Sequence, residues 1–380
     1  MNENTKKLLD NLKKNVRGMT VGMMADSTVA IRTGFIKTPS FDLNRILSGD
    51  LFHGIPEKTL VGIAGPEHSF KSSFCMLCAA DAVKEGYIPV VIDTEGGITK
   101  DFCTRWGLNV DDAIYSYEIF LERIIPFIAN LKDSGMRKMI IILDSVGGLE
   151  RMKTYNDALD ADIKQDQGQL QRSIRTLMKL LAWVCVETDS ICIFTAHMLS
   201  RPGSVPMPDD VAGGKAVKLF PSIFINLKKE SMKKEEKVVG HRLVATTMKN
   251  RFYPPFQTAA IDINYQEGIN RSAGLLELLL PDKANLLRKE GNSYFNISDD
   301  TKYATYDNAV EAKLLNDMPM MEKLNEWLKT TGYSTVDTNV KEAETLLGAV
   351  KEEAVKADVK GKKLKTNAKA RLKTRRGFNG

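Results

Sequence analysis

The sequence predicts an α/β protein in which a mostly parallel central sheet is flanked by helices. Four short apolar runs have the length of buried strands, and stretches with a helical pattern follow them. These runs are 59–64, 89–93, 139–144 and 191–195. With 380 residues, 43% of them hydrophobic and 27% charged, the chain is long enough for one large core or two smaller ones.

Composition excludes several classes of protein. The longest apolar runs, such as 139–143, are far too short to span a bilayer, and the first residues lead into no apolar stretch typical of a signal peptide. Five cysteines without framework spacing indicate a reducing compartment. We therefore expect a cytoplasmic protein with no membrane partner.

The positive charge is concentrated at one end. Of the 54 basic residues, nine lie between residues 359 and 380, where there is no acidic residue, and the other 45 are balanced by 48 acidic residues. The globular body is thus close to neutral. The basic tail favours either a solvated disordered segment or a tether for a polyanion such as nucleic acid.

The first half of the chain alternates between helices and strands. We expect a short charged helix over residues 1–16, an irregular segment over 19–33 and a brief helical turn at 43–47 before Gly49. Helices are expected after the first strand at 71–85, then at 121–131 and 170–186, where the longest amphipathic pattern lies.

After residue 220 the pattern changes. Residues 222–227, 241–249 and 259–264 predict successive antiparallel strands, and the charged run 228–237 between the first two predicts a solvated hairpin turn. Residues 274–350 predict mainly helix. No internal repeat is evident.

The strongest local signal is a phosphate-binding loop. It reads Gly65, Pro66, Glu67, His68, Ser69, Phe70, Lys71, Ser72, Ser73 and stands between a predicted strand and a predicted helix. Backbone N–H groups of such a loop surround phosphates, Lys71 would meet the outer phosphates, and the Ser72 hydroxyl would hold Mg²⁺. Phe70 departs from the general pattern, which has a glycine there because glycine tolerates unusual backbone angles.

Two carboxylates follow neighbouring strands. Asp144 ends the apolar strand 139–144 and is the carboxylate expected beside Mg²⁺ in this class of ATPase, although it could simply cap the next turn. Glu95 follows the strand 89–93 and is placed to orient and deprotonate an attacking water, but acidic residues after strands are also common in turns.

Cys75 and Cys78 have the spacing of a metal or redox pair. No second pair of this kind follows. Three residues apart on a helix, they also share one face, where small apolar side chains pack. We interpret them as core residues.

These motifs, in this order, resemble the core of the RecA-type recombinases, and most closely the UvsX recombinases of tailed phages. The resemblance runs from about residue 32 to 272. Phe70, unusual for the general motif, is a mark of the UvsX-type loop. The resemblance implies a RecA-like P-loop ATPase core, with ATP and Mg²⁺ as cofactors and a location in the host cell cytoplasm if the gene belongs to a phage.

The same resemblance implies roles for individual residues. The segment Asp93 to Thr99 resembles the one that carries the catalytic Glu, so Glu95 is the general base. Phe102 stands where the family has a Tyr stacked on adenine, and a Phe keeps that stacking face. His197 stands at the position of the γ-phosphate sensor. Lys249 and Arg251 resemble the basic pair that reaches the nucleotide of a neighbouring protomer.

Two stretches are expected to face DNA. In the first, residues 152–168 and the start of the long helix, Gly168 and Arg172 keep a family spacing. The second, residues 198–214, is rich in Pro and Gly and suits a mobile binding loop. The DNA-binding residues expected there and just beyond are Arg201, Val205, Met207, Gly213, Gly214 and Lys215.

We therefore expect four parts: an N-terminal oligomerisation element over 1–40, the ATPase and DNA-binding core over 41–272, a helical region over 273–350 and a basic disordered tail over 351–380. The expected partners are single- and double-stranded DNA, further copies in a helical filament, a single-strand-binding protein and a loader or mediator.

Two other readings share these motifs. A hexameric helicase with this fold would normally carry a separate N-terminal domain, for which the residues ahead of the loop leave little room. A non-catalytic paralogue or mediator would bind ATP without turnover, but the chain keeps Lys71, Ser72, Glu95 and Asp144.

Overall fold

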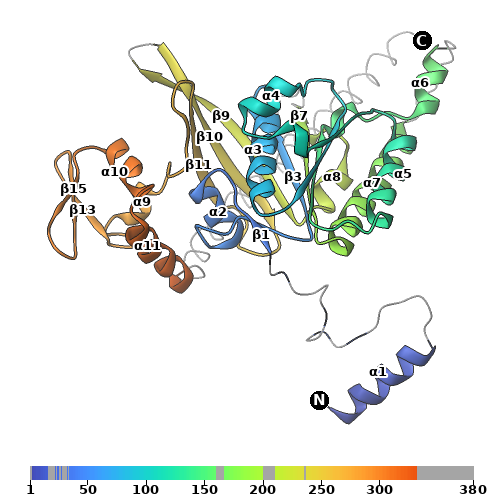
Figure 1. Cartoon of the computed structure of the whole chain (residues 1–380), viewed down its shortest axis with the longest axis horizontal. Coiled ribbons are helices and arrows are strands. Elements are labelled where there is room, and N and C mark those ends of the chain that lie inside the picture. Colours follow the sequence, from blue (N-terminus) through green and yellow to red (C-terminus); the bar gives the residue numbers. More distant parts are fainter. Residues whose placement is uncertain are drawn as a thin grey trace, which may run out of the picture.

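The central feature of the fold is one large sheet that is parallel in the middle and antiparallel at one side (Figure 1). The computed structural model describes residues 2–15, the single positions 22, 24, 27 and 32, and residues 34–159, 167–199, 210–234 and 237–331. In this part of the chain, ten strands form the sheet, in the order β12-β11-β10-β9-β3-β7-β6-β4-β5, with the short β8 paired to β7.

The parallel half contains the strands that the sequence predicts. They are β3 (Thr59–Gly65), β4 (Ile88–Asp93), β5 (Ile114–Tyr117), β6 (Met139–Asp144), β7 (Ile191–Leu199) and β9 (Ile223–Lys234). Every pair from β9 through β3, β7, β6 and β4 to β5 runs parallel. Only β5 lacks a sequence prediction, because its residues are exposed and give no apolar run.

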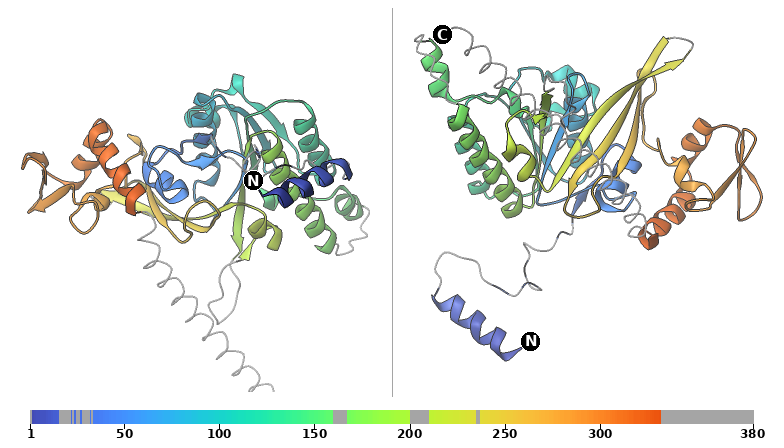
Figure 2. Two further views of the ribbon diagram at one scale, coloured as in Figure 1. Left: turned by 90° about the horizontal axis from the view of Figure 1, so that it is seen from below. Right: turned by 180° about the vertical axis from the view of Figure 1, so that it is seen from behind.

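Helices cover both faces of this half of the sheet (Figures 1 and 2). On one face, Val61, Ile63 and Ile142 pack in a core with α3 (Lys71–Lys84) and α2 (Phe41–Ser48). On the other face, Leu60 and Ile141 pack with α5 (Leu121–Asp133), α7 (Gln167–Glu187) and α8 (Lys215–Leu219). Burial on both faces explains why the strands read as continuous apolar runs. Cys75 and Cys78 are fully buried and free, as the core interpretation predicts.

Short elements connect these layers. They are β1 (Phe35–Ile36), β2 (Ile55–Pro56), α4 (Lys100–Arg105), the 3-10 turns Val110–Asp112 and Val146–Gly148, and α6 (Met152–Leu159). The N-terminal helix α1 (Glu3–Asn15) confirms the predicted helix but has no buried residue, and Figure 1 shows it away from the core. Of the predicted irregular segment 19–33, most lies outside the described residues.

The antiparallel half extends into a long two-stranded ribbon. β9 pairs with β10 (Lys237–Asn250), which pairs with β11 (Thr258–Asn264) and then β12 (Gly268–Asn270). The prediction of a solvated turn over 228–237 is wrong, because pairing continues to the Lys234–Lys237 partners. Side chains from Lys228 to Ser231 are exposed, so backbone pairing holds this part without the apolar alternation that reveals strands.

In the region after residue 273, the described residues form three helices and a small sheet that the sequence does not predict. A three-stranded antiparallel sheet of β13 (Leu287–Glu290), β14 (Ser293–Asn296) and β15 (Lys302–Ala304) lies among α9 (Leu276–Leu279), α10 (Asp307–Leu314) and α11 (Met318–Thr331). Each strand buries one residue, so no alternation marks it in the sequence. Residues 332–350 and the basic tail lie outside the described residues.

A polar cluster joins this unit to the core. The Asn325 side chain accepts from the Leu51 N–H at 2.8 Å and donates to Asp50 at 3.2 Å, and Lys329 lies 2.9 Å from the same Asp50 oxygen. Burial alone would raise the pKa of Asp50, but hydrogen bonds from Lys329, the Phe52 N–H, Asn325 and His53 together lower it to about 2.

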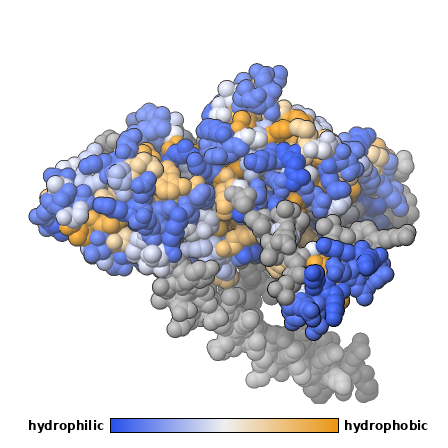
Figure 3. Space-filling model, turned by 60° about the horizontal axis from the view of Figure 1, so that its bottom comes forward, coloured by the Kyte–Doolittle hydropathy of each residue, from blue (hydrophilic) through white to orange (hydrophobic). Residues whose placement is uncertain are grey.

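The face of the molecule in Figure 3 is mainly hydrophilic. On the face in Figure 3, apolar side chains gather in separate patches rather than in one belt. Among the helices that the structure describes, none combines the length and the apolar character needed to cross a membrane.

We predict that Asp50→Asn destabilises the protein in a pH-dependent way. The folded pKa of Asp50, about 2, lies below its ordinary 3.8, so ionisation stabilises the fold above about pH 4 and is lost as pH falls toward 2. The free energy of unfolding in urea should drop by about 2 kcal/mol at pH 7. The difference in the free energy of unfolding between variant and wild type should be smaller at pH 3. A difference that does not change with pH would contradict this account.

Candidate functional site

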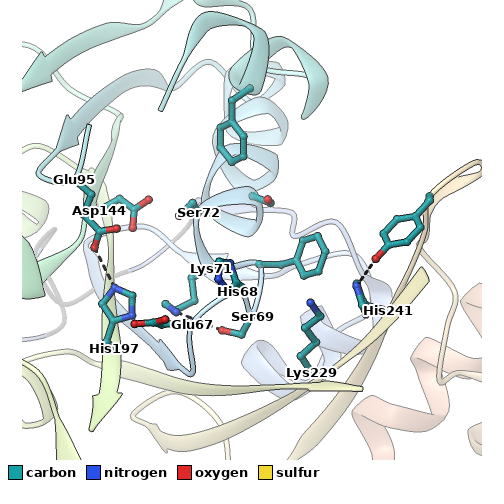
Figure 4. A pocket seen from close by; sticks show the side chains of 14 residues that line it. Glu67, His68, Ser69, Lys71, Ser72, Glu95, Asp144, His197, Lys229 and His241 are labelled. Atoms are coloured by element: carbon teal, nitrogen blue, oxygen red, sulfur yellow. Dashed lines mark hydrogen bonds and ion pairs between the residues drawn. The ribbon is translucent and has the colours of Figure 1, made fainter. Parts of the chain in front are cut away.

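The phosphate-binding loop forms one wall of a cavity of about 740 Å³ at the carboxyl ends of the parallel strands (Figure 4). The loop lies between β3 and α3, as predicted. Residues from other parts of the chain complete the lining. On the parallel side these are Glu95 after β4, Phe102 on α4, Asp144 at the end of β6 and His197 on β7. The antiparallel side adds Lys229 on β9, His241 on β10 and Tyr265 just after β11. A cavity of this size suits a nucleotide.

Phe70 adopts the conformation for which other loops use glycine. Its φ is 60° and its ψ is 22°, in the left-handed region, directly before the first residue of α3. Its ring lies 5.3 Å from the ring of His241 and 6.4 Å from that of Trp106, and Lys229 Nζ stands 5.2 Å from its centre. These contacts hold a backbone conformation that costs a non-glycine residue about 1 kcal/mol or more.

Lys71 points back into the loop. Its Nζ donates to the Pro66 carbonyl at 2.7 Å and the Gly65 carbonyl at 3.2 Å, and Ser69 Oγ lies 3.4 Å away. The side chain is 6% exposed. Burial lowers the pKa of Lys71, and the nearby Asp144 and Glu95 carboxylates oppose that shift. The ammonium is therefore held at the cavity wall by groups that a phosphate could replace.

Asp144, at the end of β6, is hydrogen-bonded to Ser72, the residue that follows Lys71 on α3. Asp144 is 6% exposed and accepts hydrogen bonds from the hydroxyls of Ser72 and Thr195. Burial raises the pKa of Asp144, and those two hydrogen bonds offset part of the shift. A hydroxyl and a buried carboxylate fit the donor set of Mg²⁺, which keeps water and phosphate oxygens as its other ligands.

The described residues hold no group of three or more His, Cys, Asp or Glu side chains that could bind a metal ion by themselves. A magnesium ion at Ser72 and Asp144 would therefore depend on oxygens that the nucleotide brings.

Glu95 is oriented by two neighbouring strands. Its Oε1 accepts from the Ser145 hydroxyl and lies 3.1 Å from His197 Nε2 (Figure 4). Burial raises the pKa of Glu95, but the hydrogen bonds from Ser145 and His197 outweigh burial, and the pKa lies below its ordinary value. Glu95 thus stays an ionised acceptor, while its side chain remains 46% exposed toward the cavity.

The ribbon supplies the residues that sequence reasoning missed. Lys229 belongs to the run that we interpreted as a turn, and the His241 ring is hydrogen-bonded to the Tyr265 hydroxyl. Burial and the nearby Lys229 lower the pKa of His241. No motif marks these residues, because a strand pairing some 160 residues after the loop places them.

Lys249 and Arg251 do not line the cavity of their own chain. They lie at the end of β10 and just beyond it, where Lys249 Nζ donates to the Leu219 carbonyl at 2.6 Å. Burial and the charge of Arg251 lower the pKa of Lys249.

Five of the residues expected to contact DNA are described. Gly168 and Arg172 are exposed on α7, and Gly213, Gly214 and Lys215 precede or begin α8. Gly213 and Gly214 have φ of 88° and 78°, and a Cβ on Gly214 would lie 2.0 Å from the Gln171 side chain, so this turn packs against the start of α7 and requires glycine. Arg201, Val205 and Met207 lie outside the described residues.

The described ends of this second segment meet beside His197. β8 (Asp210–Val211) pairs with β7 through Met198 and Val211, and the Ala212 N–H donates to the His197 carbonyl at 3.0 Å. A shift of this segment would therefore act directly on the residue that contacts Glu95.

Comparison with known proteins identifies relatives. Residues 5–270 match the model of the RecA N-terminal domain. The chain is 28% identical to "Protein RecA" of Leptospira meyeri over 281 residues, which cover 73% of this chain and 70% of that protein. It is 28% identical to "Protein RecA" of Clostridioides difficile over 72% of this chain and 77% of the relative. The RecA protein of Pseudarthrobacter chlorophenolicus is 27% identical over 78% and 84% of the two chains.

We predict that Phe70→Gly is more stable than Phe70→Ala, the reverse of the order of these two residues in a helix interior. Both variants lose the ring contacts, but only alanine bears the cost of φ 60°, so the difference should be about 1 kcal/mol. Urea unfolding of both variants measures it. Equal stabilities would show that the loop relaxes out of the left-handed conformation.

Proposed function

Because the chain belongs to the RecA family, we propose that it is an ATP-dependent recombinase that forms helical filaments on single-stranded DNA and catalyses homologous pairing and strand exchange. It would act in recombination, repair and recombination-dependent replication. The observation that carries the proposal is the arrangement of Lys71, Asp144 and Glu95 around one cavity. Glu95 is also hydrogen-bonded to His197, which directly precedes the candidate DNA segment 198–214.

In this proposal the chain binds ATP with elements already in place. The N–H groups of the loop and of the start of α3 would surround the phosphates, and Lys71 would exchange its carbonyl partners for phosphate oxygens. The Phe102 ring would stack on the base. Mg²⁺, held by Ser72 and Asp144 when bound, would neutralise charge on the phosphates.

Glu95 would remove the proton from the attacking water. Its low pKa keeps it ionised at neutral pH, and its two hydrogen bonds fix the direction in which its free oxygen points. His197 would sense the γ-phosphate and transmit its state to the DNA segment, because the Ala212 N–H donates to the His197 carbonyl and β8 pairs with the two residues that follow His197 on β7.

The filament would complete the site with residues of a second copy. Lys249 and Arg251 do not line the cavity of their own chain, which is consistent with a role at a neighbouring protomer's nucleotide. The N-terminal helix buries nothing in its own chain, which suits an oligomerisation element over residues 1–40. By resemblance, we propose a single-strand-binding protein and a loader as further partners.

The presence of Phe70 in the phosphate-binding loop, a mark of the UvsX-type loop, supports a place among the phage recombinases of that type, and such a protein would act in the host cytoplasm. Gly168, Arg172, Arg201, Val205, Met207, Gly213, Gly214 and Lys215 are our candidates for the DNA contacts.

We expect ATP hydrolysis by the full chain to be stimulated by single-stranded DNA and to fall by at least about a hundredfold in Glu95→Gln, which keeps the shape of the side chain but cannot accept the proton. ATP binding should persist. Glu187→Gln, an exposed acid at the end of α7, is the matched control and should leave turnover unchanged.

Electron microscopy of the same sample with a slowly hydrolysed ATP analogue separates the alternatives. Helical filaments support the recombinase. Closed rings would instead favour a helicase, and bound ATP with turnover no higher than in Glu95→Gln would favour a non-catalytic mediator.

We predict that inactive variants complement one another if Arg251 acts across protomers. Glu95→Gln and Arg251→Ala should each lose turnover alone, but a 1:1 mixture should recover about a quarter of wild-type activity, because one interface in four then pairs an intact Glu95 with an intact Arg251. A mixture no more active than its components would place Arg251 outside the neighbouring site.

A further inference from the structure

The loop that carries Glu95 is organised by a single buried carboxylate. Asp93, at the end of β4, is 1% exposed. Its Oδ1 accepts from the N–H groups of Glu95 at 2.9 Å and Gly96 at 2.8 Å, and its Oδ2 accepts from the Ile98 N–H at 2.9 Å. Three backbone donors from one short loop thus converge on one side chain, so the position of that side chain sets the path of the loop.

A fourth donor reaches Asp93 from outside the loop. Tyr115 lies on β5, the last strand of the sheet order, and its hydroxyl donates to Asp93 Oδ2 at 3.1 Å. The residue as a whole is 50% exposed, so the hydroxyl is directed inward while the rest of the side chain faces solvent. Burial of the hydroxyl and the Asp93 charge raise the pKa of Tyr115 to about 12, so the hydroxyl remains a donor at neutral pH.

We propose that Tyr115 is a positioning residue for ATP hydrolysis, which orients Glu95 through Asp93. This inference rests on the proposed function, because it assigns Glu95 the role of general base. Tyr115 is not among the residues that line the cavity, and its hydroxyl makes its one hydrogen bond within the described residues to Asp93, so its effect on Glu95 would pass through the Asp93 carboxylate.

The energetic argument concerns Oδ2. Without the tyrosine hydroxyl, this oxygen keeps only the Ile98 N–H among the described partners, and it is too buried for water to replace the lost donor freely. The carboxylate and the loop would then shift to share the remaining donors. In the proposed reaction, Glu95 Oε1 stays hydrogen-bonded to Ser145 and His197 while Oε2 faces the attacking water. A small shift of the loop would misalign Oε2 and lower the rate of the chemical step.

Tyr115→Phe tests the proposal, because it removes one oxygen atom and keeps the ring. We expect kcat for single-stranded-DNA-dependent ATP hydrolysis to fall about tenfold, with KM for ATP changed by less than about twofold. Tyr117→Phe is the matched control. Tyr117 is on the same strand, is 62% exposed, and its hydroxyl has no hydrogen bond to any described residue, so its kcat should equal that of wild type.

A second background distinguishes positioning from a general structural effect. In Glu95→Gln, adding Tyr115→Phe should lower the residual turnover no further, because the group that it positions is already absent. A tenfold loss in that background as well, a matching loss in ATP affinity, or a kcat equal to wild type for Tyr115→Phe alone would each overturn the proposal. Urea unfolding of Tyr115→Phe verifies that the variant is folded.

These outcomes are separable from failure of the proposed function. A wild-type protein without DNA-stimulated turnover would refute the recombinase and, with it, the role of Tyr115. An active wild type with an unaffected Tyr115→Phe variant would refute the positioning role alone and leave the recombinase intact.

Discussion

The parallel register of four neighbouring strands is the constraint on which the site depends. In this register Gly65 of β3 stands beside His197 of β7, and Asp93 of β4 stands beside Asp144 of β6. Both faces of these strands are buried, so a slip of one residue would turn an entire set of apolar side chains to the wrong core. The burial that stabilises the sheet therefore also fixes which functional residues meet.

A pair of reciprocal hydrogen bonds then locks the loops that leave two of these strands. Thr94 Oγ1 donates to the Ser145 carbonyl at 2.8 Å and accepts from the Ser145 N–H at 2.9 Å. Because Ser145 also donates to Glu95, the loop after β6 positions the candidate base on the loop after β4. Strand register brings these loops within range, and side-chain hydrogen bonds supply the finer alignment that chemistry requires.

Charge in this site is held at an energetic cost. Lys71 and Asp144 are each 6% exposed. Burial lowers the pKa of Lys71 and raises that of Asp144, so it favours the neutral form of both. The Asp144 and Glu95 carboxylates oppose the shift at Lys71, and hydrogen bonds from Ser72 and Thr195 oppose the shift at Asp144. In the proposed function, a triphosphate would add negative charge beside Lys71 and Mg²⁺ would add positive charge beside Asp144. The strained conformation of Phe70 belongs to the same wall of the cavity.

Local sequence is sufficient to locate the buried strands, the main helices and the linear motifs. Lys71, Ser72, Asp144 and Glu95 could be predicted because each depends on a strand end next to it in the chain, where apolar runs are unambiguous. Only the tertiary structure brought Lys229, His241 and Tyr265 to the cavity, and only it showed the small sheet after residue 286. Exposed ribbons, and strands that bury only one residue, lack the alternation of apolar and polar residues by which strands are predicted. Contacts such as the hydrogen bond from Tyr115 to Asp93 join side chains of separate strands. Which strands are neighbours depends on the order of strands in the sheet, and local sequence does not encode that order.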